Sequence, residues 1–168
     1  DINENENPRA DVTIILSQNR PKAEITYPLF PIRYVPACSQ KFLDSNLDIS
    51  GSPIQLVNTS TLITHSSRPT LWNRWKDYAN LKMLEPDKVI YVDSMFALAR
   101  AAESGVGIAL IPLPISQEWL DNKILVSLHQ KQLKTDDYYW ISINNNSSQL
   151  ETARVFAEWL FKKFSKVS

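Results

Sequence analysis

The sequence is poor in the residues from which several common functional sites are built. Its 168 residues include one cysteine, Cys38, three glycines and two histidines. A single cysteine excludes an internal disulfide and a cysteine metal cluster, and it favours a reducing compartment. His65 and His129 lie about sixty residues apart and form no recognisable set of metal ligands. The sequence therefore predicts neither a metal nor a cofactor.

The few glycines also argue against nucleotide-binding and hydrolase motifs. Gly105 and Gly107 have no third glycine after them and precede a strand, whereas a dinucleotide fingerprint opens a helix. No phosphate-binding P-loop occurs, and no G-x-S-x-G nucleophile elbow is present. A small hydrolase would have to use His65 as its base, and an ordinary loop histidine explains that residue better.

The chain has neither an excess of one charge nor a long apolar run. Eighteen basic residues balance eighteen acidic ones. Phosphate contacts need a basic surface, so this chain is a poor candidate for binding DNA by itself. No apolar run approaches the ~20 residues of a membrane span, and no signal peptide is visible, so we expect no membrane contact. An apolar content of 43% fits an ordinary globular core.

The clearest pattern lies between Tyr91 and Pro112. Residues 88–92 are β-branched or aromatic in most positions and predict a strand. Ser94 is a helix N-cap type, and the apolar residues of 94–104 recur at helical spacing. Gly105 supplies the left-handed C-cap geometry. The unbroken apolar run that follows predicts a strand covered on both faces, as in a parallel sheet.

Two features of this region leave alternatives open. Ser94 is either an ordinary cap that satisfies a backbone N–H, or the start of a helix that faces a cleft and attracts an anion. The cleft reading follows because open α/β sheets bind ligands at the carboxyl ends of their strands. The two readings are compatible. Trp72 and Trp75, with Tyr78, form either a ligand-stacking surface or the packing face of an amphipathic helix, which we favour.

The rest of the chain alternates short strands and helices, which predicts an α/β fold. Residues 25–36 contain Pro28 and Pro31, and proline is excluded from the middle of a central ladder, so we interpret them as a strand followed by a crossing segment. The other predicted strands are 10–16, 62–64, 107–111, 124–128 and 138–143; the other predicted helices are 39–45, 70–80, 116–120 and 148–166, the last with a capping box of Ser148 and Glu151.

Taken in order, several segments resemble the effector-binding domain of LysR-type transcriptional regulators. The resemblance covers roughly residues 10–164, and Trp72, Trp75, Tyr139 and Trp140 are similar to the subgroup of glycine-cleavage and β-lactamase regulators. The segments that carry it include ADVTIIL at 10–16, YPLFPIRYVPACSQKFL at 27–43, LITHSSRPTLWNRW at 62–75, VDSMFALARAAESGVGIALIP at 92–112 and YYWISINNNSSQLETARVFAEWLFKKF at 138–164.

The resemblance implies an α/β, two-lobed fold like that of type 2 periplasmic binding proteins. Lobe I would hold residues 1–31 and 115–168, and lobe II would hold residues 32–114. The family domain has a further strand and helix before Asp11, preceded by a helix-turn-helix domain that binds DNA. Neither is present in this sequence, so we expect a domain truncated at the N-terminus, with the DNA-binding domain absent.

The resemblance also implies where an effector would bind. Relatives often carry an arginine or an aromatic residue near Leu16, and its absence here argues against an anionic ligand gripped by arginine. The predicted ligand-binding residues are Leu16, Ser17 and Tyr139 from lobe I, and Thr64, His65, Ser66, Ser94, Met95 and Phe96 from lobe II.

The implied function is effector sensing in a cytoplasmic, DNA-binding transcriptional regulator, not catalysis. A small-molecule effector bound between the lobes would shift the arrangement of a homodimer or homotetramer, and thereby DNA binding. Helix 39–45 and a lobe I helix would join the subunits. The alternatives are a periplasmic-type solute-binding protein and, least favoured, the hydrolase. The effector is not identified, and a domain that senses pH or another protein also fits.

Overall fold

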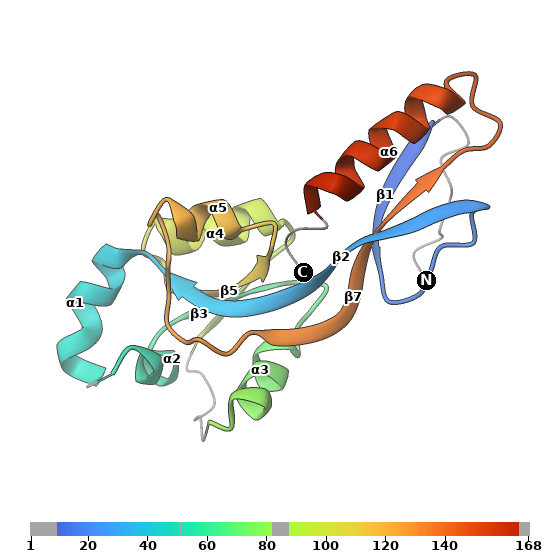
Figure 1. The fold of residues 1–168 in the computed structure, drawn as a ribbon. Coiled ribbons are helices and arrows are strands. Elements are labelled where there is room, and N and C mark those ends of the chain that lie inside the picture. Colours follow the sequence, from blue (N-terminus) through green and yellow to red (C-terminus); the bar gives the residue numbers. More distant parts are fainter. Residues whose placement is uncertain (1–9, 51, 82–87, 165–168) are drawn as a thin grey trace. The chain divides into compact units, whose positions relative to one another are not determined.

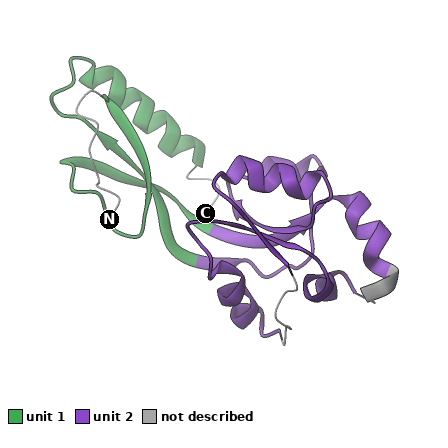
Figure 2. Cartoon of the chain, turned by 180° about the vertical axis from the view of Figure 1, so that it is seen from behind, with its two compact units in different colours: residues 1–32, 135–168 green, residues 33–134 purple. Residues whose placement is uncertain are grey.

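The computed structural model describes residues 10–50, 52–81 and 88–164 (Figure 1). The chain forms two compact units, shown in Figure 2: unit 1 holds residues 1–32 and 135–168, and unit 2 holds residues 33–134. Two strands run from one unit into the other, β2 (Ile25–Cys38) and β7 (Leu133–Ile143). The first boundary lies within one residue of the predicted one, whereas the second follows residue 134 instead of residue 114.

The position of residues 115–134 corrects the predicted lobe boundary, because this segment belongs to unit 2. Helix α5 (Gln117–Asp121) packs Trp119 and Leu120 against the buried core of that unit. Strand β6 (Val126–Ser127) pairs antiparallel with the last two residues of β2, and Leu125 is fully buried in the same core. Apolar burial and strand pairing thus hold the segment on unit 2.

Unit 1 is a small antiparallel sheet with one long helix along it. Strand β1 (Val12–Ser17) pairs antiparallel with β7, and β2 lies on the other side of β7. Helix α6 (Leu150–Phe164) runs along these strands (Figure 1) and buries a helically spaced stripe. The ring of Phe164 lies 4.7 Å from the ring of Phe30. The buried stripe consists of Ala153, Ala157 and Leu160.

Strand β2 is continuous over fourteen residues, so the prediction of a strand with a separate crossing segment was wrong. The backbone of Pro36 shows why proline is tolerated there. The amide of Leu128 donates to the Pro36 carbonyl at 2.9 Å. The polar backbone groups of Pro36 therefore face β6. Because β6 has two residues, the missing proline N–H interrupts no long ladder. Pro28 lies where its side chain is exposed.

Unit 2 is a mixed sheet with helices on both faces. Strand β5 (Ile108–Leu113) pairs antiparallel with β2 and parallel with β3 (Leu62–His65), which in turn pairs parallel with β4 (Val89–Val92). All six residues of β5 are buried, as the apolar run predicted. Figure 1 shows α4 (Met95–Glu103) and α5 on one face, and α2 (Leu56–Thr59) and α3 (Leu71–Ala79) on the other.

The two tryptophans of α3 belong to the core of unit 2. Trp72 is 4% exposed and Trp75 is fully buried, and their rings meet edge to face at 6.0 Å. The indole N–H of Trp72 donates to the Ile63 carbonyl of β3 at 3.1 Å. The packing interpretation is therefore confirmed for both tryptophans, whereas Tyr78 is exposed.

Two helix starts complete the comparison with the predicted elements. Helix α1 (Gln40–Ser50) is longer than predicted and begins after Ser39, whose hydroxyl accepts the Phe42 amide at 3.3 Å. A short 3-10 turn, η1 (Pro53–Gln55), precedes α2. At α6 the predicted capping box was wrong: the hydroxyl of Ser147, which also donates to Asp11, accepts the amide of Gln149.

Candidate functional site

The predicted site residues form two groups, one in each unit. Unit 2 contributes the end of β3, with Thr64 and His65, then Ser66 at the start of the turn after β3, and the start of α4 at Ser94. Met95 and Phe96 belong to the same helix start. The remaining three residues lie on β1 and β7 of unit 1.

Strand pairing brings the two segments of unit 2 together. His65 lies opposite Val92 in the parallel register of β3 and β4. The amide of Ser66 then donates to the carbonyl of Val92 at 2.7 Å. Since Ser94 follows two residues after Val92, the turn after β3 and the start of α4 share the carboxyl ends of two neighbouring parallel strands. Open α/β sheets hold small ligands at this end.

Local hydrogen bonds fix the turn after β3. The carbonyl of His65 accepts the Arg68 amide at 2.8 Å, and its ring Nδ1 accepts the Ser67 amide at 3.2 Å. The Ser67 hydroxyl lies 2.8 Å from the same Nδ1. A ring nitrogen that accepts an amide proton leaves the proton of a neutral imidazole on Nε2. His65 thus has a defined orientation and tautomer, with Nε2–H as a donor.

The hydroxyl of Thr64 is buried and holds the turn in place, so it does not face solvent. The residue is 1% exposed, and its hydroxyl donates to the Arg68 carbonyl at 3.3 Å. Ser67 and Arg68 are therefore part of this site, although the sequence reasoning did not single them out. The signal was present in the run Ser-Ser-Arg-Pro, because serine side chains bond locally in turns and proline fixes the backbone.

Ser94 caps α4 in the predicted manner. Its backbone is extended, its hydroxyl accepts the Ala97 amide at 3.4 Å, and its carbonyl accepts the Leu98 amide at 3.0 Å. The amides of Met95 and Phe96 precede the first bond within the helix and point along the positive end of its dipole. The capping interpretation is confirmed. The helix start also offers donors to a ligand, as the cleft interpretation requires.

Phe96 is exposed and pairs with a partly buried tryptophan of a second helix. Its side chain is 60% exposed, and its ring lies 6.0 Å from the ring of Trp119 on α5. The guanidinium of Arg100 lies 5.5 Å from the centre of the Phe96 ring. Sequence reasoning missed Trp119 as a neighbour of the site, because α5 is distant in the chain and no pattern links it to α4.

The unit 1 group is brought together by the pairing of β1 with β7. Leu16 lies directly opposite Tyr139 in the antiparallel register. The Ser17 carbonyl accepts the indole N–H of Trp140 at 3.0 Å, and the ring of Tyr139 lies 5.3 Å from that of Phe30. The three predicted residues are thus close neighbours within unit 1.

Two hollows, one in each unit, are lined by other residues than these groups. In unit 1 a hollow of about 410 Å³ is lined by residues that include Thr13, Lys22 and Asn144. In unit 2 a hollow of about 380 Å³ lies between α5 and the segment that precedes β7. None of the nine predicted residues lines either hollow. Within residues 10–50, 52–81 and 88–164, no three His, Cys, Asp or Glu side chains are grouped to hold a metal ion.

The chemistry of the unit 2 group is that of binding. It offers the amide donors at the start of α4, the Nε2–H of His65 and the hydroxyls of the serine turn. The pair of Ser67 and His65 forms within a single turn, and the Nδ1 atom is shared with the Ser67 amide, so the hydroxyl gains no dedicated base of the kind that nucleophilic catalysis needs. In the part of the chain that is described, no helix has the length and apolar character needed to cross a membrane.

The sequence matches a known family of domains and one curated relative. The family model of the LysR substrate binding domain matches residues 3–165. The HTH-type transcriptional activator AmpR of Enterobacter cloacae is 27% identical over 116 residues, which are 68% of this chain and 39% of that protein. The chain thus spans about two fifths of this curated relative.

Two solved structures share the fold. The AmpR effector binding domain from Citrobacter freundii superposes with a TM-score of 0.75 at 21% identity, over 93% of this chain and 75% of that one. The effector domain of AmpR from Pseudomonas aeruginosa gives a TM-score of 0.73 at 22% identity, over 92% and 72% of the two chains. The predicted α/β fold, like that of type 2 periplasmic binding proteins, is confirmed.

Proposed function

Because this chain belongs to the LysR substrate binding domain family, we propose that it senses a small-molecule effector for a DNA-binding transcriptional regulator. The family match, which extends over nearly the whole chain, carries this proposal. The alternative of a solute-binding protein for transport has the same fold. It gains no support from the curated relative, which is a transcriptional activator.

The geometry of unit 2 supports a binding place at the carboxyl ends of β3 and β4. There Ser66, which directly follows His65 at the end of β3, is hydrogen-bonded to the segment that leads into Ser94. We propose that these residues, with Met95 and Phe96, contact the effector. Thr64 acts by holding the turn through its bond to Arg68. Contacts from Leu16, Ser17 and Tyr139 are a further part of the proposal.

The donors of this group indicate the chemistry of the effector. Amides at a helix start and an imidazole N–H favour a ligand that presents acceptor oxygens, such as a carboxylate or an amide carbonyl. Position 16 is a leucine and so offers no guanidinium to a carboxylate. We therefore expect recognition through several neutral donors, and modest affinity gains from any single one of them.

The protein would act as a binding module that does not convert its ligand. It would work in the cytoplasm as a homodimer or homotetramer, and reach DNA through a helix-turn-helix domain outside residues 1–168. A ligand shifts an equilibrium only by its differential affinity for the states involved. The effector must therefore bind one arrangement of the regulator better than another, and DNA binding changes with it.

A thermal-shift screen of the folded chain against polar metabolites tests the proposal. A ligand at one hundred times its dissociation constant raises the free energy of unfolding by about 2.7 kcal/mol. We expect hits among carboxylates and amides. A well-folded sample that no library member stabilises would contradict a small-molecule effector and would favour a protein partner or a pH signal.

Two serine variants form a matched pair for any hit. Ser94→Ala and Ser39→Ala each remove a hydroxyl that accepts an amide at the start of a helix, and each should cost about 1 kcal/mol of stability. Only Ser94→Ala should also reduce the stabilisation by the ligand. An equal ligand response in both variants would rule out the start of α4 as the binding place.

A further inference from the structure

The hollow of unit 2 has the size and wall of a second binding place. Its volume of about 380 Å³ is within the range of small-molecule sites. Strands β2 and β5 contribute part of an apolar wall, and α5 and the segment after β6 contribute the rest. The apolar residues are Val35, Leu113, Leu120 and Leu128.

The remainder of the wall is polar but uncharged. Its residues are Gln117, Ser127, His129, Gln130 and Gln132. The Nδ1 atom of His129 accepts the amide of Lys131 at 2.9 Å, so the neutral ring carries its proton on Nε2. None of the nine described residues that line the hollow is an Asp, Glu, Lys or Arg.

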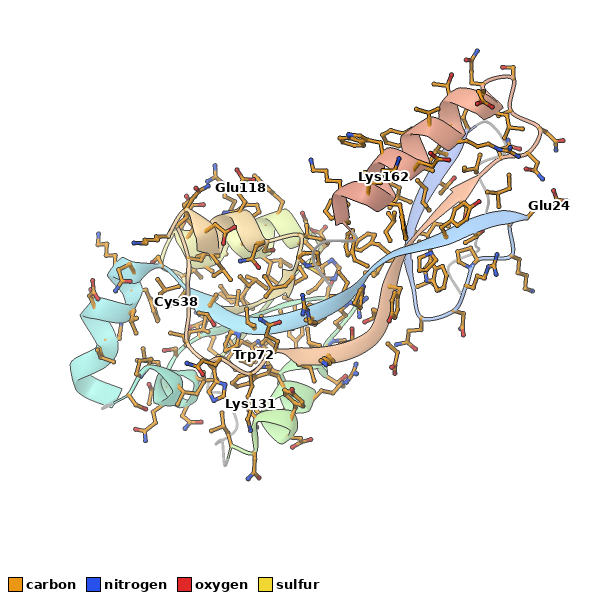
Figure 3. The ribbon with its side chains drawn as sticks, in the orientation of Figure 1. Glu24, Cys38, Trp72, Glu118, Lys131 and Lys162 are labelled. Carbon is orange, nitrogen blue, oxygen red and sulfur yellow. The ribbon has the colours of Figure 1, made fainter. Side chains whose placement is uncertain are left out.

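Two charged side chains close to this wall in the sequence make hydrogen bonds, one to α3 and the other to Gln117 of the wall. The ammonium of Lys131, labelled in Figure 3, donates to the Ala79 carbonyl of α3 at 3.4 Å. The carboxylate of Asp121 accepts the side-chain amide of Gln117 at 2.9 Å. Neither side chain lines the hollow. Because no Asp, Glu, Lys or Arg lines the hollow, a charged ligand would enter without an opposite charge in the wall to replace its hydration.

The segment that carries the polar wall is held in place before any ligand arrives. The Ser127 hydroxyl donates to the His129 carbonyl at 2.8 Å, and the Leu128 amide donates to the Pro36 carbonyl at 2.9 Å. The ring of His129 stands edge-on to the buried ring of Trp75 at 5.6 Å. A wall ordered in advance lowers the entropy cost of binding.

The hollow also adjoins both connections between the units. Val35 lies on β2 shortly after that strand enters unit 2, and Gln132 directly precedes β7, which leaves it. A molecule in the hollow would therefore contact β2 and the residue that directly precedes β7.

We propose that this hollow binds a neutral small molecule that combines amide or hydroxyl groups with one apolar face. A charged ligand would lose hydration without compensation, and a wholly apolar ligand would leave the side-chain amides of Gln130 and Gln132 unpaired. The inference does not depend on the proposed effector site, because the two groups share no residue.

Two probes of the same skeleton test the class of ligand. N-acetyl-L-leucinamide carries two amides and an isobutyl group, and N-acetyl-L-leucine replaces one amide with a carboxylate. In ¹⁵N–¹H NMR titrations of the whole chain, we expect the amide probe to shift the signals of residues 127–132. The acid should bind about tenfold more weakly or worse, because its charge gains no partner. Equal binding of both probes, or no binding of the amide, would overturn the proposal.

Substitutions of the glutamines in the wall show where the amide probe binds. Gln130→Ala and Gln132→Ala should each weaken the amide probe several-fold, whereas Gln18→Ala, an exposed glutamine of unit 1, should leave it unchanged. The same spectra show whether each variant is folded. Ser94→Ala should not alter this titration, so failure of the effector proposal and failure of this one are distinguishable. Shifts confined to the turn after β3 and the start of α4 would contradict the second site.

Discussion

The amide of Ser66 donates a 2.7 Å hydrogen bond to the carbonyl of Val92. This bond extends the parallel pairing of β3 and β4 by one residue beyond His65 and Val92. It fastens the turn after β3 to the chain just before Ser94 starts α4. The candidate site therefore rests on the sheet through backbone bonds, which side-chain substitutions in the turn leave in place.

Substituting alanine for either of the two glycines after α4 should lower the stability of the fold, but by different amounts. Gly105 has a φ of +77°, and an added Cβ would meet only the Ser39 hydroxyl at ordinary distance. Gly105→Ala should thus cost the left-handed backbone penalty of about 1–2 kcal/mol. At Gly107 an added Cβ would overlap the Thr61 carbonyl oxygen, which also accepts the Ile108 amide.

We therefore expect Gly107→Ala to cost about 3 kcal/mol or more, since backbone must move. Urea unfolding of both variants provides the comparison. Gly105→Asn serves as control, because asparagine tolerates the left-handed region and should cost less than alanine there. A Gly107→Ala variant as stable as Gly105→Ala would contradict the described contact with Thr61, the residue before β3.

The two buried tryptophans of α3 predict unequal effects of the same substitution. Trp72→Phe removes ring volume and the indole bond to the Ile63 carbonyl. Trp75→Phe removes similar volume, but its indole N–H has no acceptor among the described residues. We expect Trp72→Phe to cost about 1 kcal/mol more than Trp75→Phe in chemical denaturation, the net value of a buried hydrogen bond. A larger loss for Trp75→Phe would show that its N–H has a partner.

Local patterns predicted the part of the fold that local forces determine. The strand, helix and strand around α4 lie within one or two residues of their predicted bounds, because Ser94 and Gly105 mark the helix ends and β5 is uniformly apolar. The attachment of residues 115–134 to unit 2 could not be predicted in this way. It depends on the pairing of β6 with Ala37 and Cys38, far away in the sequence.

The candidate site, like the fold, could be predicted from the sequence only in part. The family resemblance assigned Thr64, His65, Ser66 and Ser94 to the effector site of lobe II, and the parallel pairing of β3 with β4 is what brings them together. The roles of Ser67 and Arg68 depend on the hydrogen bonds of the turn at residues 66–70, and the contact of Phe96 with Trp119 depends on how α5 packs. Neither leaves a periodic signal in the sequence.

Cys38 predicts a pH dependence of stability at alkaline pH. Burial of its side chain raises the pKa of the thiol to about 11. Below about pH 8.5 the thiol is protonated in both the folded and the unfolded chain, so its contribution is constant. Between about pH 8.5 and 11 only the unfolded chain ionises, and the free energy of unfolding falls as pH rises, by at most about 1.4 kcal/mol per pH unit.

Denaturation of the parent chain and of Cys38→Ala across this pH range isolates the thiol. The variant should be less stable at pH 7 because it leaves a small cavity, but its stability should fall less steeply above pH 8.5. The folded parent should also resist alkylation by iodoacetamide at pH 8, because the thiolate is the reactive form. Rapid alkylation without unfolding would contradict the burial of Cys38.

The central claim is that an effector binds where the turn after β3 meets the start of α4. The most direct measurement is a ¹⁵N–¹H NMR titration of the folded chain with a compound that stabilises it in the thermal-shift screen. We predict that the amide signals of Ser66, Ser67 and Ala97 shift together and saturate with one dissociation constant, and that Ser94→Ala weakens it while Ser39→Ala does not. A saturable titration that leaves these three amides unmoved would contradict the account.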